Sequence, residues 1–195
     1  LSHVDNALDV LDAGCGAGGY GLALAQDGHR VCLLDFAAPM LEAAQRQAEA
    51  LDPTLLERLS FHCLPVHQVK EQFPDGAFDV VLCHTLLEYV DEPGEIIADL
   101  ARCLCQDGAL SLLCANRYAD ALRWIWRKGD PEMARVALEE PTGSADLFGL
   151  PRRTFCPPEI HQALESAGLT VIAQRGIRIV ADYVPGKKLE DPAFY

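Results

Sequence analysis

The stretch LDVLDAGCGAGGYG, from Leu8 to Gly21, decides the fold of this chain, because an apolar, strand-like run leads directly into a glycine-rich turn. Its glycines satisfy two patterns at once. One pattern is G-x-G-x-x-G, which in dinucleotide-binding folds places a pyrophosphate at a helix N-terminus, and it is formed by Gly14, Gly16 and Gly19. The other is D-x-G-x-G-x-G, formed by Asp12, Gly14, Gly16 and Gly18. Both predict a strand, a ligand-binding loop and a helix, so the glycines alone leave the ligand open.

The charge of Asp12 distinguishes the two patterns. Asp12 precedes the first glycine by two positions, where its carboxylate opposes the pyrophosphate of a dinucleotide. A ligand with an ammonium group and a sulfonium finds the same carboxylate favourable, directly or through a bridging water. S-adenosylmethionine has both cations and no phosphate. Asp35 ends the next apolar run, and either pattern requires an acid there for the ribose hydroxyls of an adenosine.

Strand-like and helix-like segments alternate along the first part of the chain. The strand-like runs are continuously apolar, which is typical of parallel strands that are covered on both faces. We therefore predict an α/β fold with a doubly wound, mostly parallel, Rossmann-like sheet and helices on both faces. The expected strands are residues 8–12, 30–34, 59–64, 78–84 and 109–115, and the expected helices are residues 20–26, 39–51 and 93–105, with a short helical segment at 66–73.

This alternation is interrupted between Asn116 and Pro158. A helical segment that carries both tryptophans is followed by a loop full of turn-forming residues. Long insertions after a strand often form substrate lids, so we expect a helical lid here. A helix at 158–168 and one long or two short strands at 169–184 should follow. We predict a single domain, residues 1–195, divided into a cofactor-binding half (1–115), a lid and acceptor insert (116–158), and a last helix and strand (159–195).

Composition narrows the function classes. The 195 residues, half of them apolar, suit one α/β domain, and a net charge of −13 argues against a general nucleic-acid binder. Residues 1–116 hold 5 basic and 18 acidic side chains, whereas residues 117–195 hold 11 of each, so an anionic partner should meet the second half. Most of the eight cysteines lie in apolar runs without zinc-ligand spacing. We expect a cytoplasmic protein with no metal and no membrane-spanning helix.

Four blocks of the sequence resemble the class I S-adenosylmethionine-dependent methyltransferases. They are VLDAGCGAGG, LLDFAAPMLEAA, FDVVLCHTLLEYVDEP and LARCLCQDGALSL, in the order that this family has. The resemblance implies a methyltransferase with S-adenosylmethionine as cofactor and S-adenosylhomocysteine as its product. The implied cofactor contacts are Asp12, Gly14, Cys15, Gly16 and Gly18 in the first block, Asp35, Phe36 and Met40 in the second, and His84 in the third.

The turn after the third strand departs from the family pattern. Many members place an Asp there to hold the adenine amino group, but FHCLPVHQV contains none. We expect backbone groups of Leu64, Pro65 and Val66 to hold the adenine instead. In this family the counterpart of His84 commonly touches the methionine end of the cofactor. A binding or orienting role is therefore favoured over a catalytic base for His84.

The second half of the chain resembles a narrower group, the bacterial tRNA carboxymethoxyuridine methyltransferases, which esterify a carboxylate on the wobble uridine. The matched features are Asn116, Gly129, Arg153-Thr154, Gly176, Arg178, Asp182 and Tyr183. The resemblance implies tRNA modification, with His84, Asn116 and Arg178 at the reacting groups and Arg178 in a carboxylate clamp. A small-molecule acceptor is the alternative, and a non-catalytic binding module is a third hypothesis. The sequence does not indicate the oligomeric state.

Cations and aromatic side chains of the second half offer contacts for an anionic acceptor. Arginine suits bidentate recognition of phosphate or carboxylate, and aromatic rings stack on unpaired bases. The candidates are Arg117, Arg123, Arg127, Lys128, Arg152, Arg153, Arg175 and Arg178, with Tyr118, Trp124 and Trp126. For Trp124 the alternative is burial in a lid helix. The family also has helices before the first strand and a final antiparallel strand, and we expect both to be missing from this chain.

Overall fold

The computed structural model describes residues 7–143 and 152–177. Among these, residues 7–114 and 162–169 form one compact unit, and residues 115–143, 152–161 and 170–177 form a second. The change of unit after residue 114 lies beside the expected start of the insert. The single-domain organisation stays a prediction.

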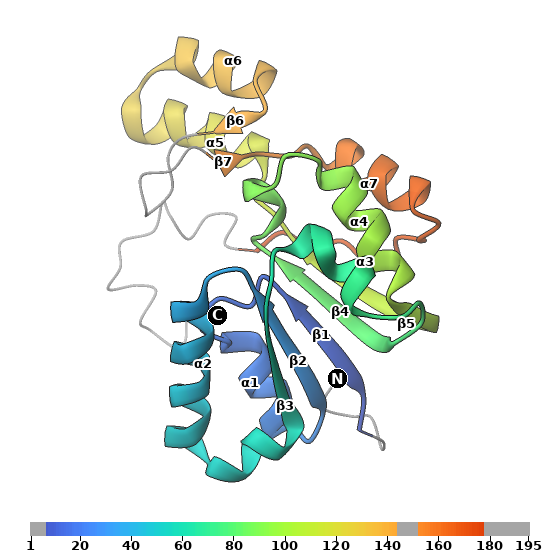
Figure 1. Ribbon diagram of the computed structural model, residues 1–195. Helices are drawn as coiled ribbons and strands as arrows, with labels where there is room; N and C mark the ends of the chain where they lie inside the picture. Colours follow the sequence, from blue (N-terminus) through green and yellow to red (C-terminus); the bar gives the residue numbers. More distant parts are fainter. Residues whose placement is uncertain (1–6, 144–151, 178–195) are drawn as a thin grey trace. The chain divides into compact units, whose positions relative to one another are not determined.

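The first unit is built on a five-stranded parallel sheet with the strand order β3-β2-β1-β4-β5 (Figure 1). The order reverses between β1 and β4, so the carboxyl ends of these two strands flank the place where open α/β sheets bind ligands. The predicted doubly wound parallel sheet is confirmed. The strands are β1 (Asp9–Ala13), β2 (Arg30–Asp35), β3 (Leu59–Cys63), β4 (Phe78–His84) and β5 (Leu104–Leu113).

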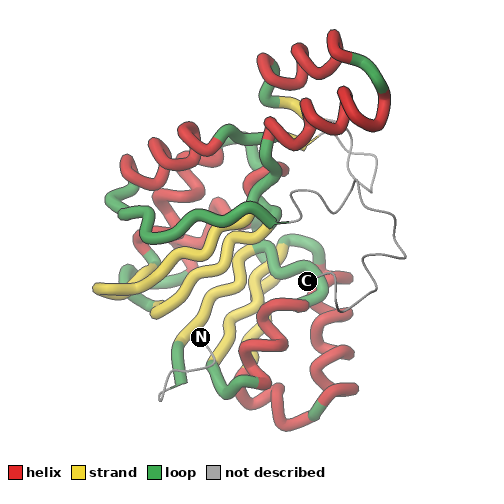
Figure 2. The backbone as a smooth tube through the Cα atoms, turned by 180° about the vertical axis from the view of Figure 1, so that it is seen from behind, coloured by secondary structure: helices red, strands yellow, loops and turns green. Residues whose placement is uncertain are grey.

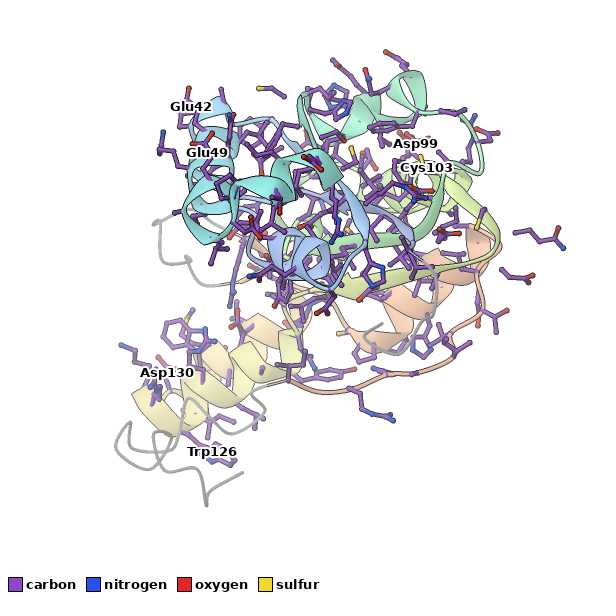
Figure 3. All side chains as sticks on the ribbon, turned by 90° about the horizontal axis from the view of Figure 1, so that it is seen from below. Glu42, Glu49, Asp99, Cys103, Trp126 and Asp130 are labelled. Carbon is purple, nitrogen blue, oxygen red and sulfur yellow. The ribbon has the colours of Figure 1, made fainter. Side chains whose placement is uncertain are left out.

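Helices cover both faces of this sheet (Figure 2). On one face, Leu22 of α1 and Ala44 of α2 pack against Val10, Leu33 and Leu82 of the strands in a buried apolar cluster. On the other face lie α3 and α4, and the Asp99 carboxylate and Cys103 thiol of the α4 region are labelled in Figure 3. The helices are α1 (Gly19–Gln26), α2 (Ala38–Leu51), α3 (Val69–Gln72) and α4 (Pro93–Arg102), with short 3-10 turns η1 (Pro53–Arg58), η2 (Val66–Gln68) and η3 (Leu87–Tyr89).

The junction between α4 and β5 differs from the prediction. The helix ends at Arg102 and the strand begins at Leu104, whereas the sequence predicted a turn at Asp107-Gly108 before a strand at 109–115. The ladder pairs Phe78 with Leu104 and then Val80 with Ala109, so residues 105–108 form an irregularity inside β5. Asp107 has a φ of 64°, a left-handed conformation that is common in turns. The Asp-Gly pair therefore has the composition of a turn although it lies within an irregular strand.

The second unit contains the predicted helical insert. It comprises α5 (Arg117–Arg123), a π-helical turn η4 (Trp124–Lys128) and α6 (Pro131–Glu139), with a two-residue antiparallel pairing of β6 (Thr142–Gly143) and β7 (Arg152–Arg153). Gly129 adopts a φ of 64° where the π turn ends, which is the left-handed region that favours glycine. α7 (Pro157–Ser166) begins in the second unit and ends in the first.

The strand predicted at 169–184 is not formed in the part that the structure describes. Residues 169–177 have no regular secondary structure, and Ile172 and Ile177 are 89% and 66% exposed. An apolar segment forms a strand only where a neighbouring strand satisfies its backbone hydrogen-bonding groups. Residues 178–184 of this prediction, and any final antiparallel strand, lie outside the described residues.

Two other features, a metal-binding group and a membrane-spanning helix, are absent from the described ranges. Among residues 7–143 and 152–177, no three His, Cys, Asp or Glu side chains are grouped in a way that could hold a metal ion. None of the helices in those ranges has the length and apolar character needed to cross a bilayer.

Candidate functional site

The glycine loop between β1 and α1 is held by backbone hydrogen bonds to the end of β2. The amides of Gly14 and Cys15 both donate to the Leu34 carbonyl, at 2.8 and 3.0 Å, and the Gly16 amide donates to the Asp35 carboxylate at 2.9 Å. The Gly18 amide donates to the Cys15 carbonyl at 2.9 Å. A pyrophosphate cradle needs such amides to point at the ligand. In this loop these four amides already have acceptors within the protein, which disfavours the dinucleotide pattern.

The conformations of the glycines agree with this result. Gly14, Gly16 and Gly18 have φ values of 72°, 53° and 82°, so all three lie in the left-handed region. Gly19, the third glycine of the dinucleotide pattern, is the first residue of α1, and a Cβ on it would meet nothing within 4 Å. The structure therefore favours the D-x-G-x-G-x-G pattern.

Gly21 is a further required glycine that the sequence analysis did not identify. A Cβ on Gly21 would overlap the side chain of Leu33 and would lie 3.0 Å from the Asp12 carboxylate. The absence of a side chain lets the first turn of α1 approach β1 and β2 closely. Its position two residues after the fingerprint was visible in the sequence, but only the contact with β2 explains it.

Asp12 is a buried carboxylate, 3% exposed, near the carboxyl end of β1. One of its oxygens accepts a hydrogen bond from the Gly21 amide at 3.0 Å. Burial raises the pKa of Asp12 to about 6; the Gly21 hydrogen bond opposes this rise and the nearby Asp35 adds to it. A charge kept in such surroundings favours a cationic ligand, because that ligand relieves the cost of burying the carboxylate. The ammonium of S-adenosylmethionine fits this requirement.

Asp35 ends β2 and joins it to the glycine loop. One carboxylate oxygen accepts from the Gly16 amide and the other from the Ala37 amide, both at 2.9 Å. Each carboxylate oxygen has a second lone pair, so two ribose hydroxyls can still donate to Asp35. The double amide contact fixes the orientation that such recognition needs. The site therefore fits an adenosine ribose at the predicted residue.

Apolar side chains and a second loop lie beside Asp35. Phe36 and Met40 are 76% and 41% exposed, so both side chains are accessible for contacts with a flat base. The Leu64 amide donates to the Asp35 carbonyl at 3.1 Å, which ties the turn after β3 to the end of β2. Pro65 follows in this turn, and Val66 is buried. These placements agree with an adenine site, and the individual contacts stay a prediction.

His84 is the last residue of β4 and belongs to a small polar group in the first unit. Its Nε2 lies 2.9 Å from the Ser111 hydroxyl, and its ring meets the edge of Tyr20 with the centroids 4.6 Å apart. Burial lowers the pKa of His84, so the imidazole is neutral at pH 7. Its Nδ1 is buried and has no hydrogen-bond partner among the described residues. Thr85 follows with a φ of 53°, a strained conformation for a β-branched residue.

Tyr20 and Ser111 are the two members of this group that the sequence analysis missed. Tyr20 follows the glycine loop directly, which was a usable signal. Ser111 lies in the middle of an apolar strand, and only the pairing of β5 with β4 brings it to His84.

The other two residues expected at the reacting groups are placed differently. Asn116 belongs to the second unit, where its side chain accepts a hydrogen bond from the Tyr118 amide at 2.9 Å and caps α5. This contact gives Asn116 a structural role within its own unit, and its catalytic role stays a prediction. Arg178 lies outside the described residues, as do Asp182 and Tyr183.

Several of the proposed phosphate-binding arginines are instead paired inside the second unit. Arg117 is 7% exposed and donates both terminal nitrogens to Glu159 at 2.9 Å. Arg123 and Arg152 both lie against Asp120, at 2.8 and 3.5 Å. The expectation that these three contact an anionic acceptor is therefore not supported, because each has an acidic partner within the fold.

The two tryptophans of the insert also differ from each other. Trp124 packs against the buried cluster of Ala121, Ala134 and Ala137, as the burial alternative predicted. Trp126 is 62% exposed. Sequence could not separate them, because both lie in one helical segment and the inward face depends on α6.

Comparison with known proteins agrees with this geometry. A family model described as a methyltransferase domain matches residues 11–112. The chain is 29% identical to the tRNA 5-carboxymethoxyuridine methyltransferase of Escherichia coli strain K12, over 92% of this chain and 66% of that protein. It therefore spans slightly less than two thirds of that relative. It is also 29% identical to the ubiquinone biosynthesis O-methyltransferase of Idiomarina loihiensis, over 91% of this chain and 70% of that protein.

A solved structure shows the same fold. The 1,6-didemethyltoxoflavin-N1-methyltransferase of Burkholderia thailandensis, determined with S-adenosylhomocysteine, matches with a TM-score of 0.65 and 21% identity. The match covers 92% of this chain and 68% of that one. With a family model that covers more than half of its residues, the chain belongs to the methyltransferase domain family, whose cofactor is S-adenosylmethionine.

Proposed function

We propose that the protein transfers a methyl group from S-adenosylmethionine to an oxygen acceptor, and that this acceptor is a carboxylate on a modified wobble uridine of tRNA. The observation that carries the proposal is the buried Asp12 carboxylate beside a glycine loop whose amides have internal acceptors. Such a site suits a cationic adenosyl ligand and disfavours a pyrophosphate.

The residues of the first unit divide the binding task. Asp12 holds the ammonium of the cofactor, Asp35 takes the ribose hydroxyls, and Phe36, Met40 and the Leu64–Val66 turn enclose the adenine. S-adenosylmethionine supplies a methyl group activated by a sulfonium. His84 orients the methionine end, and its contact with Ser111 fixes the ring. Positioning of the two reactants supplies much of the acceleration in an in-line displacement.

A carboxylate acceptor matches the chemistry that the site offers. A carboxylate is already a nucleophile at neutral pH, so its oxygen bonds to the methyl carbon without losing a proton. The electron pair of the broken bond stays on the departing sulfur, and the product is a neutral methyl ester. The acceptor needs only a positive clamp, which we assign to Arg178. The name of the Escherichia coli relative supports this acceptor.

A small-molecule hydroxyl is the second candidate acceptor. It is favoured by the ubiquinone biosynthesis O-methyltransferase among the relatives and by the acidic first half of the chain. A hydroxyl must lose its proton during the transfer. The neutral imidazole of His84, whose pKa is lowered by burial, is able to accept that proton.

Mass analysis of tRNA nucleosides distinguishes the two acceptors. The nucleosides are compared between a strain that contains the protein and one that lacks it. The proposal predicts loss of one uridine methyl ester and accumulation of the free acid. An unchanged tRNA profile, together with labelled methyl transfer to a small hydroxylated extract component, would support the second candidate instead.

A further inference from the structure

We infer that the π-helical turn Trp124–Lys128 is a contact surface for an unpaired nucleotide of an RNA substrate. The inference rests on the proposed function, because it names the surface by which the second unit contacts a tRNA. It is carried by the exposure of Trp126, by the fixed geometry of the turn, and by the charges next to it.

Trp126 is exposed to solvent, whereas Trp124, two positions earlier, packs against the buried cluster of the second unit. Trp124 packs on the buried Ala121, Ala134 and Ala137. The Trp126 side chain extends outward from the helical turn that carries it (Figure 3). Trp126 is 62% exposed and Ile125 is 46% exposed. Covering the exposed part of a large aromatic ring with a base removes apolar area from water, which favours binding.

The turn that carries Trp126 is fixed by contacts at its end. The Gly129 amide donates to the Ile125 carbonyl at 3.0 Å, and the Asp130 amide donates to the Trp124 carbonyl at 3.1 Å. Asp130 then caps α6 through the Met133 amide at 2.9 Å. A ring held on such a turn loses little conformational freedom when it binds, which favours affinity. π-helical turns are rare and frequently occur at functional sites.

Two cations lie next to Trp126 in the turn. Arg127 and Lys128 follow Trp126 directly and are both exposed. An aromatic ring next to two cations is the arrangement that binds single-stranded nucleic acid, since the base stacks and the cations meet the phosphates. A purely apolar patch would instead indicate a protein partner.

The test measures binding of the full chain to a fluorescently labelled RNA anticodon stem-loop, with a fully paired RNA duplex for comparison. Trp126→Ala should weaken stem-loop binding about tenfold or more, because a stacked base contributes that much. Trp126→Phe should retain most of the wild-type affinity for the stem-loop, because it keeps an aromatic ring. Lys128→Ala should lower the salt dependence of log K by about 0.7 to 0.9, the value for one phosphate contact.

Two matched variants serve as controls. Leu138→Ala removes another exposed apolar side chain, 45% exposed on α6, and Arg135→Ala removes a cation that Glu132 and Glu139 already neutralise. Both should leave RNA binding unchanged. Equal losses in the controls and in Trp126→Ala would overturn the inference, and so would equal binding of the stem-loop and the duplex.

Measuring S-adenosylhomocysteine binding in parallel distinguishes failure of the inference from failure of the proposed function. Weaker RNA binding by Trp126→Ala with unchanged S-adenosylhomocysteine binding supports the inference. Unchanged RNA binding overturns it and leaves methyl transfer to another acceptor standing. Loss of self-association in Trp126→Ala, without any effect on RNA, would assign the surface to a second copy of the chain and would also overturn the inference. Failure of the wild type to bind S-adenosylhomocysteine would contradict the proposed function itself.

Discussion

The buried negative charge of Asp12 destabilises the free protein, but it favours binding of a cationic ligand. Its pKa of about 6 lies above the ordinary value of 3.8, so keeping it charged in the folded state at pH 7 costs about 3 kcal/mol. Asp12→Asn retains an acceptor for the Gly21 amide. The variant should be more stable than wild type at pH 7 in urea unfolding, yet should bind S-adenosylmethionine at least tenfold more weakly, since it loses a charge-assisted contact. A variant that is less stable and binds normally would show that the carboxylate is structural.

The same pKa predicts a pH dependence with a definite sign. The folded-state pKa of Asp12 is raised, so this group stabilises the free protein at low pH, and that contribution is lost as pH rises from about 4 to 6. Ligand binding needs the charged form, so affinity should rise between pH 5 and pH 7. The lowered pKa of His84 acts in the opposite sense on stability, because its protonation below pH 6.5 is penalised in the fold. Titration calorimetry of wild type and Asp12→Asn at several pH values isolates the contribution of Asp12, which should be absent from the variant.

At the scale of single residues, Asp12 and Asp35 could be proposed from the sequence because each is an acid at the end of an apolar run. The structure places both against the glycine loop or the start of α1, and their roles as ligand contacts stay a prediction. Arg117 was misassigned, because its partner Glu159 is distant in sequence and only the fold shows that the pair is internal. Ser111 was missed for the same reason, since strand pairing brings it to His84.

Two glycines of α1 make a matched test of the loop geometry. Gly21→Ala places a methyl group against Leu33 and should destabilise the protein by about 1 to 3 kcal/mol, as overpacked cores do. Gly19→Ala meets no atom within 4 Å and lies at a helix start, so it should be neutral or stabilising by up to about 1 kcal/mol. Urea unfolding of both variants provides the comparison. The reverse order of stabilities would mean that Gly19 is the closely packed residue, as in dinucleotide folds.

A buried arginine, Arg117, connects several segments of the second unit. Arg117 donates to Glu159 and to the Thr154 carbonyl at 2.9 Å, and its own amide pairs with the Phe155 carbonyl at 3.0 Å. Arg117→Ala should therefore open the second unit, at a cost of about 2 to 3 kcal/mol. Hydrogen exchange should show faster exchange in α5 and α6 and no change in β1 and β4. Arg117→Lys should not restore protection, because an ammonium lacks the two-pronged geometry. Uniformly faster exchange across all strands would indicate one cooperative unit instead.

Element boundaries were predictable where caps and turns fix them locally. α2 and β4 follow the sequence pattern closely, whereas β5 begins earlier than expected, because its irregularity at 105–108 has the composition of a turn. The strand predicted at residues 169–177 is absent for a non-local reason. An apolar segment forms a strand only beside another strand that satisfies its backbone groups.

Across the whole chain, residues 1–116 carry 5 basic and 18 acidic side chains and residues 117–195 carry 11 of each. The doubly wound parallel sheet and the place of the glycine loop within it could be predicted from the sequence, because parallel α/β folds allow few topologies. The acceptor could not, because it depends on side chains that the sequence pattern does not bring together.

The most direct test of the account is a calorimetric titration of the full chain with S-adenosylmethionine and, separately, with NAD. The two ligands share an adenosine, so Asp35 and the adenine contacts treat them alike. They differ in that one carries cations toward Asp12 and the other carries a pyrophosphate toward the glycine loop. The account predicts saturable, micromolar binding of S-adenosylmethionine and no binding of NAD. Binding of NAD without binding of S-adenosylmethionine would contradict it.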